Sequence, residues 1–297
     1  MGMYEQIASN KRKSYLLIFL FLIFIIAIGY VIGFFYGNSY FGLGLAFVIG
    51  VIYFLISYYS GANMILTLTR AKEAKKPQYT YLINTVEGIA IAAGLPKPPK
   101  VYVIDDDAMN AFCTGRDPSH SAITVTTGLL KRMNKLELEG VIAHEMAHIK
   151  NYDIRVMMLA SVMVGITILL SDFLLRSFLW GNRDRDNNQM TIIFIVVGIV
   201  LAILAPLVGE VIKLAVSRKR EYLADASGAM LTRYPKGLAD ALKKIKDDPD
   251  PLVDHANKAT AHLFISTPFR KTKKSFIKNL FNTHPPIENR IQRLEAM

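Results

Sequence analysis

Four long apolar runs, arranged in two pairs, dominate the pattern of hydrophobic and polar positions along the chain. They extend over about residues 15–36, 40–60, 156–175 and 190–208. Each is close to the roughly 20 residues that an α-helix needs to cross the hydrocarbon core of a bilayer. Because the runs are apolar on all faces, they favour membrane spans over buried helices of a soluble core. The pattern therefore predicts four transmembrane helices.

The two runs of each pair are close enough in sequence to form hairpins. Gly37-Asn38-Ser39 is typical of a tight turn, which predicts a transmembrane hairpin over residues 1–62. No small-residue cleavage site follows the first run, so we interpret it as a retained signal anchor and not as a cleaved signal peptide. The second pair predicts another hairpin over residues 155–209. Whether spans three and four cross the bilayer fully is left open by the pattern.

Shorter periodic segments predict one α+β domain in two parts, residues 63–154 and 210–297. A helical pattern over residues 80–93 stops at Gly94, a residue favoured just after the last turn of a helix. The other predicted elements are a helix over residues 136–150 and strands over residues 101–104, 122–126 and 108–112, the last ended by Gly115. If the strand over residues 108–112 forms a sheet edge, an extended peptide could pair with it.

Composition and charge support this membrane interpretation. Hydrophobic residues make up 52% of the chain and the mean hydropathy is +0.29, which is more apolar than is usual for a soluble enzyme. The formal net charge of +11 is expected to report basic cytoplasmic flanks and not nucleic-acid binding. The first turn is uncharged, whereas both ends of the first hairpin are basic, with Lys11, Arg12, Lys13, Arg70, Lys72, Lys75 and Lys76. Both ends, and the domain that follows, are therefore expected in the cytoplasm.

The sequence His144-Glu145-Met146-Ala147-His148 carries the clearest chemistry. Two histidines four residues apart share one face of a helix, so both imidazoles can reach a single metal ion. In the H-E-x-x-H pattern of zinc peptidases the histidines bind Zn²⁺ and the glutamate takes a proton from the attacking water. The alternative is a surface helix with two solvated histidines, which requires no glutamate at that position. Leu136, Ile142 and Ile149 are predicted to form the buried stripe of this helix.

A third ligand is expected directly after the fourth apolar run. Glu221 and Asp225 are four residues apart and share a face of a predicted helix. A catalytic zinc site needs three protein ligands and one open position, so Glu221 would complete a His₂Glu set. Asp225 could hydrogen-bond a ligand histidine. Alone, this pair would be read as part of a solvated helix face, but together with the first motif it predicts a complete zinc site.

Several other polar features are assigned no chemistry. Asp105-Asp106-Asp107 is expected to form a solvated turn, because consecutive side chains on an extended chain point in alternate directions. Cys113 excludes an internal disulfide framework and is expected to be a small core residue and not a nucleophile. His255 and His262 lack a partner carboxylate pattern. The basic cluster at residues 270–274 fits a solvated loop and an anionic lipid surface equally well.

The motifs resemble those of HtpX-like membrane zinc metallopeptidases. The resemblance rests on the order of the H-E-x-x-H motif, Asn110-Ala111-Phe112, Glu221-Tyr222-Leu223-Ala224-Asp225 and His284-Pro285-Pro286. It implies an α-helical membrane protein with four transmembrane helices and a cytosolic α+β zincin-like (gluzincin) protease domain, in the inner or plasma membrane. It also implies an endopeptidase of the stress response and of protein quality control, which cleaves misfolded or damaged membrane proteins. A related group with the same metal motifs, but with more spans and a longer chain, cleaves prenylated (CAAX-type) proteins.

Residue roles follow from the same resemblance. His144, His148 and Glu221 match the ligands of one Zn²⁺ per chain. Glu145 matches the general base, and Asp225 matches a residue that orients a ligand histidine. Asn110, Ala111 and Phe112 match an edge strand that binds substrate. His284 or Arg290 matches a hydrogen-bond donor near the reacting carbonyl.

The expected partners are membrane-protein or peptide substrates and the lipid bilayer, without nucleic acid. The oligomeric state, a homo-oligomer included, is left open. Besides the endopeptidase and the prenyl-protein protease, two other classes remain. A metal-binding membrane scaffold with an inert site is disfavoured by the complete set of three ligands and a base. A transporter or channel is favoured by the spans alone, but polar residues within them are few, and Asp172 and Glu210 lie near span ends.

Overall fold

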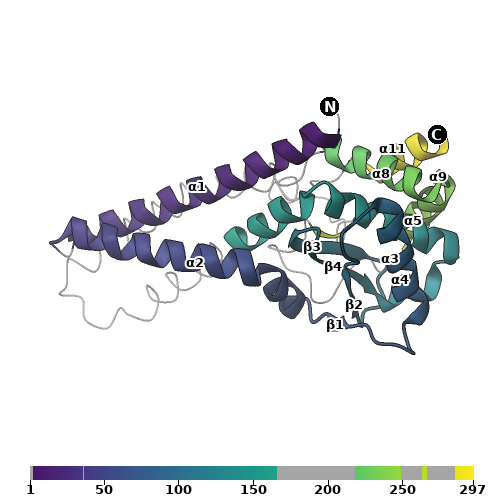
Figure 1. Ribbon diagram of the computed structural model, residues 1–297, viewed down its shortest axis with the longest axis horizontal. Helices are drawn as coiled ribbons and strands as arrows, with labels where there is room; N and C mark the ends of the chain where they lie inside the picture. The colour runs from purple at the N-terminus through teal and green to yellow at the C-terminus, as the bar shows by residue number, and fades with distance from the viewer. Residues whose placement is uncertain (1–2, 36, 166–217, 249–262, 266–284) are drawn as a thin grey trace.

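The computed structural model describes residues 3–35, 37–165, 218–248, 263–265 and 285–297. A long helical hairpin projects from a part built of a small sheet and several helices (Figure 1). The start of the hairpin lies beside the helices of the C-terminal part (Figure 1). Segments far apart in the sequence therefore meet where the hairpin joins the sheet-and-helix part.

The hairpin consists of α1 (Met3–Phe35) and α2 (Ser39–Leu68). Both are long and apolar enough to cross a membrane, over Ile7–Tyr30 and Ser39–Leu68, and the part of the chain that the structure describes holds no other such helix. The predicted turn is present, since Gly37 has a φ of +79° and the Asn38 side chain caps α2. Gly33 and Gly42 let the two helices approach closely, because a Cβ on either one would collide with backbone of the other helix.

Only the beginning of the third apolar run is described. Residues 153–165 are helical and largely buried, and they pack against the hairpin. Val156 and Ala160 cluster with Leu17 of α1, and the Tyr53 hydroxyl of α2 donates to the carbonyl of Val162 at 3.2 Å. The rest of the third run and the whole fourth run lie outside the described residues.

The sheet has four strands in the order β1-β2-β4-β3, namely β1 (Lys72–Glu73), β2 (Lys100–Ile104), β4 (His120–Thr126) and β3 (Ala111–Asp117). β2 and β4 are parallel, and the other two pairings are antiparallel. The two predicted strands over residues 101–104 and 122–126 are confirmed. β3 stands last in the order and is therefore an edge strand.

The bounds predicted for the remaining strand were wrong. Residues 108 and 109 do not join the sheet, because side chains hold their backbone: Asp106 accepts from Ala108 N, and Asp248 accepts from Met109 N at 2.7 Å. The carbonyl of Asn110 accepts from Thr126 N of β4, but this residue stands just before the strand. β3 begins at Ala111 and continues through Gly115, which was expected to end it. Gly115 has a φ of +149°, and a Cβ there would collide with the backbone of β4, so this strand position requires glycine.

Six helices complete the described part: α3 (Thr80–Ala93), α4 (Thr127–Arg132), α5 (Lys135–Lys150), α8 (Arg218–Thr232), α9 (Pro235–Lys246) and α11 (Ile287–Glu295). α3 ends at Gly94 as predicted, with a φ of +68°. α5 begins with a capping box between Asn134 and Glu137 and lies at the centre, in contact with α3, α8, α9 and β3. The predicted burial of Leu136 was wrong, since this first-turn residue is 47% exposed.

Candidate metal centre

α5 presents two histidines to the same point in the core. The Nε2 atoms of His144 and His148 lie 3.3 Å apart, and the two rings are perpendicular. α8 brings the carboxylate of Glu221 to the same point, with Oε1 3.5 Å from Nε2 of His148 and Oε2 3.8 Å from Nε2 of His144. All three side chains are buried. Residues that are far apart in sequence therefore converge as three potential ligands.

Two of the three distances between these groups fit a tetrahedral metal ion, and the third, between His144 and Glu221, is longer at 3.8 Å. One ligand atom from each of His144, His148 and Glu221 lies within 4.8 Å of the others. With bonds of about 2.0–2.2 Å and tetrahedral angles, two ligand atoms of a zinc site are about 3.3–3.6 Å apart. The separation of the two Nε2 atoms and that of Oε1 from Nε2 of His148 match this range. Two neutral imidazoles and one carboxylate form a donor set that suits Zn²⁺.

Small residues on α8 allow Glu221 to come this close. Gly228 packs against the backbone of α5, where an added Cβ would lie 3.0 Å from His144 N and 3.2 Å from the carbonyl carbon of Ala143. Ala224 is fully buried between Glu221 and Gly228 on the same helix. The distance between the two helices, and with it the position of Glu221, is therefore set by residues with little or no side chain.

Asp225 lies beside Nδ1 of His144, and Arg290 contacts both residues, with its Nη2 3.3 Å from Nε2 of His144. Oδ1 of Asp225 lies 3.0 Å from Nδ1 of His144, so the carboxylate can hold the ring with Nε2 directed toward the ligand cluster. Arg290 of α11 donates two hydrogen bonds to this carboxylate, from Nε to Oδ2 at 2.9 Å and from Nη2 to Oδ1 at 2.7 Å. Its Nη1 lies 3.6 Å from Oε2 of Glu221. Burial raises the pKa of Asp225, but the charge of Arg290 and the contact with His144 outweigh burial and lower it to about 2.

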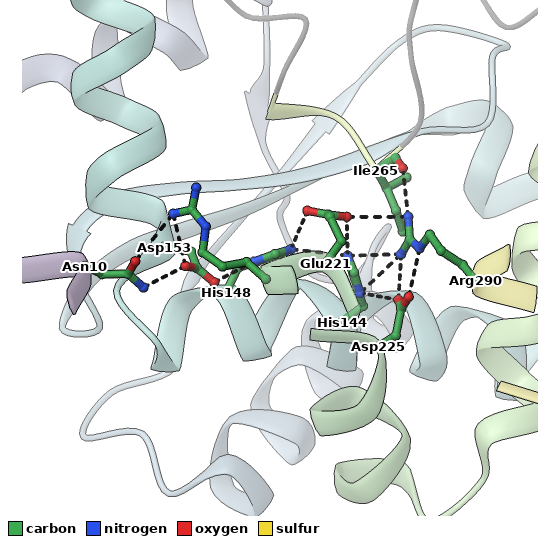
Figure 2. Close-up of polar contacts among 9 residues, drawn as sticks. Asn10, His144, His148, Asp153, Glu221, Asp225, Ile265 and Arg290 are labelled. Atoms are coloured by element: carbon green, nitrogen blue, oxygen red, sulfur yellow. Dashed lines mark hydrogen bonds and ion pairs between the residues drawn. The ribbon is translucent and has the colours of Figure 1, made fainter. Parts of the chain in front are cut away.

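Asp153 performs the corresponding role for His148. Its Oδ2 lies 2.9 Å from Nδ1 of His148, and its Oδ1 is approached by Asn10 of α1 at 2.7 Å and by Arg220 of α8 at 3.4 Å. Burial lowers the pKa of His148, but the hydrogen bond to Asp153 and the charge of Glu221 outweigh burial and raise it to about 9. Figure 2 follows these contacts from Asn10, through the two histidines, to Arg290 and Ile265.

Glu145 is buried on α5 between the two histidines in sequence, with 2% of its surface exposed. Cys113 of β3 is fully buried nearby. Burial, with the neighbouring carboxylate of Glu145, raises the pKa of the Cys113 thiol well above its ordinary value. The thiol therefore stays protonated, in agreement with the prediction that it is a core residue and not a nucleophile.

The three residues that were expected to bind substrate lie at the start of the edge strand. Asn110 stands just before β3, and its backbone N donates to the Thr126 hydroxyl while its carbonyl accepts from Thr126 N. Ala111 opens the strand, and its carbonyl accepts from Ile265 N at 2.9 Å. The ring of Phe112 is buried against that of Phe264, with centroids 5.1 Å apart. Phe112 thus faces the core, and the segment over residues 263–265 lies along the β3 edge.

The structure also adds residues that the sequence analysis missed. Asp153 contacts His148, and Asn10 and Arg220 contact Asp153, although none of the three was assigned a role. Asp153 had a weak signal, since an acidic residue shortly after a metal-binding helix can turn back onto it. Arg220 directly precedes Glu221, but Asn10 has no local signal in the sequence. Arg290 was expected near the site and lies there, whereas His284 lies outside the described residues.

A helix with the H-E-x-x-H motif, whose two histidines converge with a distant glutamate, is the arrangement found in metallopeptidases. The chain belongs to peptidase family M48, because the model of that family matches residues 76–297. A relative from Dictyoglomus thermophilum, "Protease HtpX homolog", is 47% identical over 297 residues, with 99% of this chain and 94% of the relative covered. A protein with the same description from Caldanaerobacter subterraneus subsp. tengcongensis is 46% identical, with 99% of this chain and 98% of the relative covered. Another, from Listeria monocytogenes, is 43% identical, with 99% of this chain and 100% of the relative covered.

Among solved structures, the "Crystal Structure of S. mikatae Ste24p" is 19% identical, with a TM-score of 0.49. The alignment covers 94% of this chain and 62% of that one. On the evidence of the family and the curated relatives, the chain is a membrane metallopeptidase, a hydrolase with a metal-binding cluster of His144, His148 and Glu221.

Proposed function

We propose that the chain is a zinc-dependent integral membrane endopeptidase whose single Zn²⁺ is held by His144, His148 and Glu221. The observation that carries this proposal is the convergence of these three buried side chains, whose ligand atoms lie within 4.8 Å of one another, with Glu145 on the same helix. When bound, zinc activates water and polarises the scissile carbonyl. Zinc, rather than another divalent ion, is supported by the His₂Glu donor set.

The protein groups perform the rest of the reaction. Glu145 accepts a proton from the attacking water and returns it to the leaving nitrogen, as a general base that becomes a general acid. Asp225 orients His144 and Asp153 orients His148, each through Nδ1, so both Nε2 atoms stay directed at the metal. Arg290 balances the charges of Asp225 and Glu221. Any part of His284 in catalysis is implied by the family resemblance alone.

The edge strand β3 is the proposed platform for substrate. Its outer edge offers backbone groups to an extended peptide from Ala111 onward, beside the helix that carries Glu145. Asn110 supports this end of the strand from the inner side, since its backbone N and O both bond Thr126 of β4. The carbonyl of Ala111 already accepts from Ile265 N. A substrate strand would therefore share or displace this bond. The backbone of Phe112 pairs with Thr124 of β4, so Phe112 supports the strand from within through its ring.

The proposed membrane arrangement has hairpins over residues 1–62 and 155–209 and a peptidase domain in two parts, residues 63–154 and 210–297. Four spans would return the chain to the cytoplasmic side before Glu221. The basic residues at both ends of the first hairpin support a cytoplasmic peptidase domain. A site on that side suits the cleavage of misfolded or damaged membrane proteins, the quality-control role that we propose.

The full-length protein in proteoliposomes provides the test. We expect it to cleave an unmodified, destabilised membrane protein, to lose this activity when a chelator removes the metal, and to regain it with Zn²⁺. His148→Ala should bind no stoichiometric zinc, whereas the matched variant His120→Ala should bind it normally, because His120 is exposed and pairs with Asp117 away from the site. Cleavage that survives metal removal, or that is restricted to a prenylated peptide, would overturn the proposal.

A further inference from the structure

The N-terminal membrane helix reaches the metal centre through one side chain. Asn10 of α1 is 1% exposed, and its amide nitrogen Nδ2 donates to Oδ1 of Asp153 at 2.7 Å and to the carbonyl of Asn151 at 2.9 Å. Asn151 is the residue that ends the metal-binding helix α5. Asn10 therefore joins the end of that helix to the carboxylate that contacts His148, as Figure 2 shows.

The chemistry at this point requires an amide NH₂ group. Both neighbours of Nδ2 are acceptors, a backbone carbonyl and a carboxylate oxygen, and an amide supplies two donors on one atom. Rotating the amide by half a turn would place its oxygen against both acceptors. The side-chain oxygen instead lies 3.5 Å from Nη1 of Arg220, a donor. The orientation of Asn10 is thus fixed by its surroundings.

The two oxygens of Asp153 have different partners. Oδ2 faces Nδ1 of His148 at 2.9 Å, whereas Oδ1 receives Asn10 at 2.7 Å and Arg220 at the longer distance of 3.4 Å. A carboxylate held at one oxygen cannot rotate freely about its side-chain bonds. The short bond from Asn10 therefore determines where Oδ2 points, and Oδ2 in turn determines where Nε2 of His148 points.

We propose that Asn10 is a positioning residue of the metal centre, which acts through Asp153 on His148. The N-terminal membrane helix is then a structural part of the zinc site and not only an anchor. This inference rests on the proposed function, since it takes His148 as a metal ligand. It extends the centre to a helix that lies outside the matched region of residues 76–297.

Simple anchoring of α1 is the competing explanation, and other contacts already provide it. Leu17 packs against Val156 and Ala160, and all three residues are buried. Ser14, one turn after Asn10, is equally buried, but among the described residues its hydroxyl donates only to the carbonyl of Asn10 within its own helix. Ser14→Ala is therefore a matched control that removes a buried polar group of α1 without touching Asp153.

The test compares zinc affinity by chelator competition in the full-length, detergent-solubilised protein. Outer partners of metal ligands typically contribute roughly 10–100-fold to metal affinity, so Asn10→Ala should weaken Zn²⁺ binding by roughly 10-fold. Asn10→Asp, which keeps the size but loses both donors, should weaken it further. Ser14→Ala should leave it unchanged. The visible spectrum of the Co²⁺-substituted protein should shift in Asn10→Ala and not in Ser14→Ala.

A double-mutant cycle separates positioning from anchoring. If Asn10 acts through Asp153, the variant Asn10→Ala/Asp153→Ala should bind Zn²⁺ as Asp153→Ala alone does. An undiminished effect of Asn10→Ala in the Asp153→Ala background, or wild-type affinity in Asn10→Ala, would overturn the inference while leaving the proposed function intact. Absence of zinc binding by the unaltered protein would overturn the proposed metal site and this inference with it.

Discussion

The Nδ1 atom of His148 lies 2.9 Å from Oδ2 of Asp153, a buried contact that ties the metal-binding helix to the start of the helix that follows it. A carboxylate at this position fixes the ring and makes the histidine more basic. The same contact gives the metal-free protein a group that must lose a proton before it can bind a metal.

Zinc affinity should therefore depend on pH up to the pKa of His148, which is about 9 in the metal-free protein. Below that pH one proton must leave His148 for each ion bound, so affinity should rise by about tenfold per pH unit and then level off. Conversely, the stability that protonated His148 gives the metal-free fold is complete below its ordinary pKa of 6.5 and is lost as the pH rises through about 9. Competition titrations across this range check the prediction. In Asp153→Asn the levelling should move to lower pH, and a curve of unchanged shape would contradict the assignment.

Replacement of Gly228 by alanine should weaken zinc binding without any change to a ligand. The added Cβ would press on the backbone of α5 at His144 and push α8, with Glu221, away from the histidines. Overpacking of this kind costs about 1–3 kcal/mol of stability. Gly88→Ala is the control, because an added Cβ on α3 meets no atom within 4 Å. Thermal unfolding and zinc titration of both variants would decide the matter, and equal behaviour would count against the close contact of α5 and α8.

Loss of Arg290 should destabilise the fold more than loss of its neighbour on α11. Arg290→Leu would leave the buried carboxylate of Asp225 without its bidentate partner, at a cost of about 3–5 kcal/mol. Arg293 stacks on the ring of Tyr222 at the surface, so Arg293→Leu should cost only about 0.5–1 kcal/mol. Thermal unfolding of the two variants measures the difference. Adding Asp225→Asn to Arg290→Leu should recover part of the stability, and no recovery would mean that Arg290 acts through other contacts.

Local features of the sequence predicted much of what the structure contains. Helix geometry alone places His144 and His148 on the same face of α5. The end of α3 at Gly94 depends on the freedom of this one residue to adopt a positive φ. The apolar runs predicted α1 and α2 because a membrane span needs length and composition alone. Such features require no knowledge of what packs against them.

Contacts between distant segments could not be predicted in the same way. The start of β3 depends on Asp248, which lies far along the chain and fixes the backbone of Met109. Asn10 and Asp153 are 143 positions apart, and neither has a spacing that indicates the other. The partners of His144 and His148 also differ, Asp225 on α8 and Asp153 after α5, although the two histidines are equivalent in the motif.

The orientation of the first hairpin yields a separate prediction. Asn10 meets Asp153, and α2 leads into β1, so both ends of the hairpin lie at the peptidase part, with the uncharged turn at the opposite end. The basic residues at those ends should keep them in the cytoplasm. Alkaline phosphatase, which is active only outside the cytoplasm, should be active when fused after Asn38 and inactive when fused after Met297. The reverse pattern would place the peptidase domain on the other side.

The central claim, that Glu145 activates water at a zinc ion bound by His144, His148 and Glu221, is tested most directly with Glu145→Gln. Gln has nearly the same shape but cannot accept the proton, and positioned general bases typically contribute about 10²–10⁴-fold to rate. The measurement is zinc content together with cleavage of a membrane-protein substrate by the full-length variant. The account predicts one Zn²⁺ per chain with cleavage reduced by at least about 10²-fold. Cleavage at the rate of the unaltered protein would contradict it.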